Sequence, residues 1–244
     1  MQLKAPTIER LVVGLDDTSA DAGVLAWAEQ EAAARQCPFR VLATRGDNPD
    51  DFLDEAADAT LLIVGTEPLA GGGRRGSCPM VVVRGTQRKQ LRRIVVGVDS
   101  SNASAAALDW AMAEAARHHA TVRIVHAWQQ PTHGEWSLRG TDLRQADAQC
   151  IADLAADLYE AGPEPRIERR AVQGQAAEVL IAESVGADLL VVGSRGRSGY
   201  RTLQFGSVAL AAVNGADCPV VVVHPRLHRS GTGDPGDTNG TRRV

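Results

Sequence analysis

Arg93-Ile-Val-Val-Gly-Val-Asp99 is an apolar run that ends in a carboxylate, and a near copy, Arg10-Leu-Val-Val-Gly-Leu-Asp16, stands earlier in the chain. The shift that aligns the two runs also places Glu31 on Glu114, without a gap in between. Valine-rich runs with few charges are typical of strands that are buried on both faces of a parallel sheet. The chain therefore contains the same first strand twice, which indicates an internal repeat.

Two further blocks extend this repeat. Ala59-Thr-Leu-Leu-Ile-Val-Gly65 matches Ala187-Asp-Leu-Leu-Val-Val-Gly193, and Cys78-Pro-Met-Val-Val-Val83 matches Cys218-Pro-Val-Val-Val-Val223. Three blocks in the same order indicate a duplicated domain. The shift grows from the first block to the third. The first copy therefore lacks a long segment before the second block and a shorter one before the third.

The second copy is predicted to alternate strands and helices. Its predicted strands are Arg93–Val98, Thr121–Ala127, Arg166–Val172, Asp188–Val192 and Pro219–Val223, and its predicted helices are Asn102–His118, Asp142–Glu160, Ala176–Ser184 and Ser207–Asn214. Regular alternation predicts an α/β fold with a parallel sheet that helices cover on both faces.

The first copy is predicted to be shorter by one strand and two helices. Its predicted strands are Leu11–Leu15, Phe39–Ala43, Thr60–Val64 and Pro79–Val83, with a helix at Ala20–Arg35 and a short one near Asp50–Ala57. We expect a truncated domain over residues 1–84, a linker over 85–91 and a complete domain over 92–225. Residues 226–244 are polar and without periodicity, which predicts a disordered tail.

Composition restricts the classes of function. The net charge of -4 argues against a general nucleic-acid-binding surface. No apolar run is long enough to span a membrane and the amino terminus does not resemble a secretory signal, so we expect a cytoplasmic protein. The 4 cysteines lie far apart and the histidines show no ligand spacing, so no metal site is predicted.

A glycine-rich loop is the strongest candidate site. It reads Gly193-x2-Gly196-x9-Gly206-Ser207, leaves the end of a predicted strand and enters a predicted helix. Glycines let backbone N–H groups approach a ligand closely, and the amino end of a helix attracts anions. Ser207 is predicted to be the helix N-cap, and Arg195, Arg197 and Arg201 add positive charge. The alternative is a loop that only needs tight turns.

Asp99 is the second candidate. It ends the first strand of the second copy. With a strand order of 3-2-1-4-5, the order reverses between the first and fourth strands, which is where doubly wound sheets bind ligands. Asp99 and Gly193 would then face each other across one crevice. The Asp99 carboxylate could accept hydrogen bonds from a ribose or a base, or it could instead cap the following helix.

These features together resemble the universal stress protein family, specifically its tandem members and its ATP-binding branch. The resemblance rests on the glycine loop, the strand ending in Asp99 and the Cys-Pro-Val-Val-Val-Val ending, and it extends over nearly all of Arg92–Pro225. It implies two tandem doubly wound domains of strand order 3-2-1-4-5. It also implies that the last strands of the two domains pair antiparallel, making an intrachain pseudo-dimer, with a homodimer as a further option.

The resemblance also implies a role for individual residues. Asp99 would contact the nucleoside, and Ala127 would line the adenine pocket, where the family usually has a larger aliphatic residue. Val192 and Gly193 would flank the base and the ribose, with the charge of Arg195 nearby. The phosphates would be held, through backbone amides and the serine hydroxyl, by Gly196, Gly206, Ser207 and Val208. The implied ligand is ATP or another adenine nucleotide, with Mg²⁺ as an optional bridge between the phosphates.

The first copy departs from the pattern at the loop. Gly65 is retained, but Pro68 stands where the second glycine belongs, and Gly71–Gly76 runs directly into Cys78. No helix fits there, so we expect this half not to bind ATP. The leading hypothesis is a stress or regulatory protein with an unknown protein partner and no catalysis. A slow ATPase, which the arginines keep open, and a pure interaction module remain alternatives.

Overall fold

The computed structural model of the chain describes residues 9–15, 21–43, 56, 58–65, 78–84, 90–129, 148–153, 155–157, 159, 165–196 and 205–225. Several predictions lie outside these residues. They concern Asp16, most of the helix near Asp50–Ala57, the departure at Pro68 and Gly71–Gly76, Arg197, Arg201, most of the linker and the tail over residues 226–244.

The first half contributes four strands and one helix. These are β1 (Leu11–Leu15), α1 (Asp21–Arg35), β2 (Phe39–Ala43), β3 (Leu61–Val64) and β4 (Met80–Val82). β1 pairs in parallel with β2 on one side and β3 on the other, and β3 pairs in parallel with β4. Within the described residues, the order β2-β1-β3-β4 corresponds to 2-1-4-5 of the complete copy, without a counterpart of its third strand.

The second half contains all the predicted strands. Its elements are β5 (Arg93–Gly97), α3 (Asn102–His118), β6 (Thr121–Trp128), β7 (Ile167–Gln173), α5 (Ala176–Glu183), β8 (Leu189–Gly193), α6 (Ser207–Gly215) and β9 (Val220–Val223). Residues 148–153 and 155–157 are also helical, inside the helix predicted from Asp142. The order β7-β6-β5-β8-β9 is the predicted 3-2-1-4-5.

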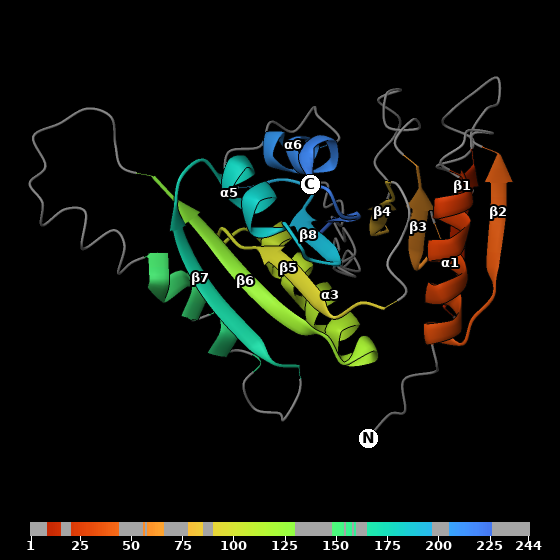
Figure 1. The fold of residues 1–244 in the computed structure, drawn as a ribbon, viewed down its shortest axis with the longest axis horizontal. Coiled ribbons are helices and arrows are strands. Elements are labelled where there is room, and N and C mark those ends of the chain that lie inside the picture. Colours follow the sequence, from red (N-terminus) through yellow and green to blue (C-terminus); the bar gives the residue numbers. More distant parts are fainter. Residues whose placement is uncertain are drawn as a thin grey trace, which may run out of the picture.

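The two halves share one nine-stranded sheet (Figure 1). β4 pairs antiparallel with β9, with Val81 opposite Val221, so the antiparallel pairing of the two last strands is confirmed. Every other pair in the sheet is parallel. The junction between two last strands is thus formed inside a single chain.

Two apolar layers cover this sheet. Alternate strand residues such as Leu11 and Ile94 pack under α1 and α3, whereas Val12 and Val95 face the layer that includes α5 and α6. This alternation follows from the period of two along a strand. Within the described residues, no helix is both long and apolar enough to cross a membrane.

A cluster of charged side chains joins α1 to α3 across the two halves. Glu31 and Glu114 are only 2% and 1% exposed. Arg35 donates to Glu114 at 2.5 Å and also pairs with Glu31. The Nε2 atom of His118 lies 2.9 Å from Glu114 and 3.3 Å from Glu31. We call Glu31, Arg35, Glu114 and His118, together with Glu9 and Arg117 at its edge, the inter-half cluster.

The positions of this cluster follow the repeat. The shift that aligns the two first strands pairs Glu31 with Glu114 and Arg35 with His118, so each helix contributes an acid and, one turn later, a base. Ligand atoms of the two glutamates and His118 lie within 4.8 Å of one another, as in a metal site. Arg35, however, already binds both carboxylates, so the cluster is a closed set of ion pairs.

Burial and pairing shift the pKa values in the cluster. Hydrogen bonds to Glu114 and Glu31 raise the pKa of His118 to about 9 against the effect of burial. Burial would raise the pKa of Glu31, but the hydrogen bond from His118 and the charge of Arg35 outweigh it and lower the pKa to about 2. Burial raises the pKa of Glu114. His118 is therefore protonated at neutral pH.

These shifts predict a loss of stability at alkaline pH. The pKa of His118 is higher in the folded state than its ordinary 6.5, so its contribution is complete below pH 6.5 and is lost as the pH rises through about 9. The melting temperature of the wild type should fall between pH 6 and pH 9.5. The His118→Gln variant should show a smaller fall over the same range. His119→Gln, a change at the exposed neighbour, is the control and should keep the wild-type slope.

Candidate functional site

The turn after β5 shapes the candidate site. Ser100 has a φ of 64°, in the left-handed region, and turns the chain from β5 into α3. The N-cap of α3 is Ser101, whose hydroxyl accepts from the N–H of Ser104. Asp99 does not cap the helix. Its Oδ1 accepts from the N–H of Ser101 at 3.1 Å, and its own N–H donates to the hydroxyl of Ser104 at 3.2 Å.

The described part of the glycine loop is held between β9 and α6. The N–H of Ser194 donates to the carbonyl of Val223 at 2.8 Å, and the N–H of Gly206 returns to the carbonyl of Ser194 at 2.7 Å. The hydroxyl of Ser101 reaches the carbonyl of Arg195 at 3.5 Å, which ties the loop to the Asp99 turn. The two sequence candidates therefore belong to one connected region.

Two loop glycines are needed for different reasons. A Cβ on Gly193 would lie 2.8 Å from the backbone carbonyl carbon of Ala103, so this glycine lets α3 pack against β8. A Cβ on Gly196 would lie 2.6 Å from Oδ2 of Asp99. Any side chain at position 196 would therefore force the Asp99 carboxylate or the loop to move.

These residues surround a cavity at the carboxyl ends of β5 and β8, where the strand order reverses. Seven predicted site residues line it: Asp99, Ala127, Val192, Gly193, Arg195, Gly196 and Val208. Its volume is about 80 Å³, below the roughly 300–1,000 Å³ typical of ligand sites. A nucleotide would therefore have to widen it.

Sequence reasoning missed part of this lining. The additional residues are Gly97, Val98, Ser104, Val125, Ala176 and Leu180. Ala176 and Leu180 are one helical turn apart on α5 and so lie on one face of that helix. The packing of α5 against β5 and β6, which brings them to the cavity, is a tertiary contact. The spacing of these two residues was the available signal, but it does not say which strand the face meets.

Ser207 corrects one prediction. The N-cap of α6 is Gly206, whose backbone is extended with φ −71° and ψ 163°, and Ser207 is the first residue of the helix. The cap is the residue whose backbone has not yet turned helical. Here that residue is Gly206, whose N–H donates to the carbonyl of Ser194. Ser207 is exposed, and neither it nor Gly206 is among the described residues that line the cavity.

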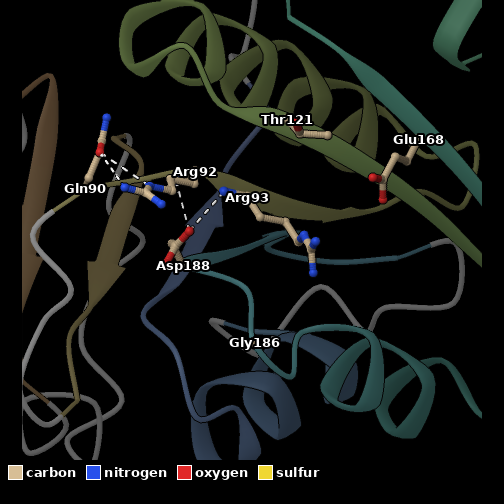
Figure 2. A pocket seen from close by; sticks show the side chains of 7 residues that line it. All are labelled: Gln90, Arg92, Arg93, Thr121, Glu168, Gly186 and Asp188. Carbon is tan, nitrogen blue, oxygen red and sulfur yellow. Dashed lines mark hydrogen bonds between the residues drawn. The ribbon is translucent and has the colours of Figure 1, made fainter.

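A larger cavity of about 480 Å³ lies at the opposite, amino end of the strands (Figure 2). Both of its carboxylates are already engaged. Asp188 accepts from the N–H groups of Arg92 and Arg93 at 2.9 and 3.0 Å. Glu168 pairs with Arg123 at 2.9 Å. The hydrogen bonds of Asp188 hold the start of β5 beside the start of β8. None of the predicted site residues is among the described residues that line this cavity.

Comparisons with known proteins agree with the architecture. The sequence profile of the universal stress protein family matches residues 90–224. A universal stress protein of Mycobacterium tuberculosis is 32% identical over 193 residues, which cover 72% of this chain and 65% of that relative. One from Mycolicibacterium smegmatis is 28% identical over 195 residues, with the same two coverages. The chain thus spans 65% of the length of these relatives.

Solved structures show the same fold. A universal stress protein from Archaeoglobus fulgidus has a TM-score of 0.58 at 14% identity, over 89% of this chain and 86% of its own. One from Pseudomonas aeruginosa has a TM-score of 0.60 at 16% identity, over 89% and 82% of the two chains. The doubly wound α/β sheet and the profile match identify a universal stress protein domain. The chain belongs to the universal stress protein family.

Proposed function

We propose that the second half of the chain binds an adenine nucleotide, with ATP as the leading ligand, and that the protein is a stress-response regulator rather than an enzyme. One observation carries this proposal: Asp99 and the glycine loop, which are far apart in sequence, line one cavity at the switch point of the sheet. Gly196 has no room for a side chain beside the Asp99 carboxylate.

Each side of the cavity suits a different part of a nucleotide. Val125, Ala127 and Leu180 offer an apolar surface for a base, and Asp99 offers a carboxylate for ribose hydroxyls. The amino end of α6 offers free N–H groups for phosphates. Among the described residues, the Nε of Arg195 is buried and has no hydrogen-bond partner, so a phosphate oxygen would satisfy it. Mg²⁺ would be an optional companion of the bound phosphates.

We further propose that residues 1–84 form a truncated partner domain that binds no ATP and that residues 92–225 form the nucleotide-binding domain. In the first half, β4 pairs with the edge of β9. The first half thereby takes the place that a second copy of the chain would otherwise occupy at this edge. The one-to-one pairing of these strands leaves β9 without a free edge for the same junction with another chain.

The direct test is native mass spectrometry of freshly purified protein, followed by calorimetric titration with ATP and Mg²⁺. We expect one nucleotide per chain. If the protein co-purifies with an adenine nucleotide or binds one in the titration, a pure interaction module is excluded. If the chain neither retains nor binds nucleotide, the proposal is contradicted. Release of phosphate above a buffer blank would instead support the slow ATPase.

A further inference from the structure

The helix α6 touches the candidate site with one end and the first half of the chain with the other. Gly206 caps its amino end and the helix finishes at Gly215. The last carbonyls of an α-helix have no partner inside the helix and carry the negative end of its dipole. One of them, the carbonyl of Asn214, accepts a hydrogen bond at 2.8 Å from Nη1 of Arg84, a residue of the first half.

The register between the halves explains this contact. Val82, the last residue of β4, pairs with Val220, the first residue of β9. The chain that leaves β4 therefore runs back past residues 216–219, which connect α6 to β9. Arg84 follows shortly after β4 and is half-buried there. The pairing of β4 with β9 thus brings the guanidinium of Arg84 to the end of α6.

The repeat adds an independent observation. The shift that aligns Cys78 with Cys218 also aligns Arg84 with His224. The ring of His224 lies 6.3 Å from that of Phe205, the residue that precedes the cap of α6. Equivalent positions after the two paired strands thus approach opposite ends of the same helix. One belongs to each half of the chain.

We infer that Arg84 is a positioning residue for the phosphate-binding end of α6, supplied by the half that binds no nucleotide. Its charge complements the carboxyl end of the helix dipole, and its hydrogen bond fixes the last turn. The inference rests on the proposed function and gives the first half a regulatory role in it. Because coupling is reciprocal, whatever loosens the β4–β9 junction weakens nucleotide binding, and bound nucleotide strengthens the junction.

The test compares ATP with adenosine, which lacks the phosphates, to isolate the contribution of the phosphates to binding. Arg84→Ala, Arg84→Lys and the control Arg166→Ala, an exposed arginine before β7, are titrated with ATP and with adenosine. We expect the Arg84→Ala variant to bind ATP about fivefold more weakly, with adenosine affinity unchanged. The Arg84→Lys variant should recover most of the loss, and the Arg166→Ala variant should match the wild type. A general loss of folded protein would instead affect both ligands alike.

A second measurement makes the failures distinguishable. In the ligand-free protein, Arg84→Ala should accelerate amide exchange in the last turn of α6 while α5 keeps its rates. Unchanged exchange, equal loss for both ligands or no loss for either would overturn the inference. If the wild type binds neither ATP nor adenosine, the proposed function fails and the phosphate role of Arg84 fails with it. If the wild type binds and the variants match it, only this inference fails.

Discussion

Replacing Arg35 with methionine is expected to lower the free energy of unfolding by about 3–5 kcal/mol. The side chain of Arg35 is 4% exposed and pairs with carboxylates that are 2% exposed. Without its charge, Glu31 keeps only His118 among the cations of the cluster, and Glu114 keeps His118 and the more distant Arg117 at 3.7 Å. When one partner of a buried ion pair is removed, the remaining charge stays buried without compensation. This desolvation penalty is larger than the net stabilisation that the ion pair provides.

Urea denaturation measures this loss, and the chain offers a matched control. Arg170 also pairs with a glutamate, Glu183, at 3.3 Å, but its side chain is 56% exposed. Arg170→Met should therefore cost at most about 1 kcal/mol. A double-mutant cycle of Arg35→Met with Glu114→Gln should show strong coupling, because the second change removes one of the stranded charges. If Arg35→Met cost as little as Arg170→Met, the inter-half cluster would not stabilise the packing of α1 against α3.

Much of the fold could be predicted because the repeat constrains it twice. The run Arg93–Gly97 and its copy at Leu11–Leu15 both form the first strand of their half. The deletion between the second and third strands of the first half removes one edge strand and leaves the central ones in register. Buried parallel strands have a strong local signature, so their boundaries were predicted to within a few residues.

The inter-half cluster could not be predicted by the same reasoning. Its acids and bases are spaced one helical turn apart on α1 and α3, which on an isolated helix indicates an exposed i,i+4 pair. Only the packing of α1 against α3 turns these pairs inward and crosses them, so that His118 meets Glu31. The alignment of Arg35 with His118 in the repeat is the signal that the sequence offers for this cluster.

The candidate site was only partly predictable for a related reason. Strand ends and glycine spacing placed Asp99 beside the loop, because the sheet topology brings them together. The N-cap of α6 depends on where the backbone turns helical, and a glycine–serine pair allows either residue to cap. The α5 side chains depend on tertiary packing. The sequence therefore indicated which residues lie near one another better than it indicated the shape of the cavity.

Replacing Gly196 with alanine is expected to weaken ATP binding about 10- to 100-fold. The new Cβ would lie 2.6 Å from Oδ2 of Asp99, so the carboxylate or the loop must move. Either movement costs at least one hydrogen bond to a charged group, each of which contributes about 1.5–3 kcal/mol. The fold should tolerate the change, because the contacted atom ends a flexible side chain. Calorimetric titration with ATP and Mg²⁺ measures the loss.

Gly65→Ala is the matched control, since Gly65 is the repeat counterpart of Gly193 at the end of β3. A Cβ there meets only Val24, at 3.8 Å, among the described residues, so neither the fold nor ATP binding should change. Asp99→Asn separates the two sources of loss, because it keeps the size of the side chain and removes its charge. If Gly196→Ala acts by displacing Asp99, the two changes combined should cost less than their sum. Equal ATP affinity in the Gly196→Ala and Gly65→Ala variants would contradict the assignment of the site.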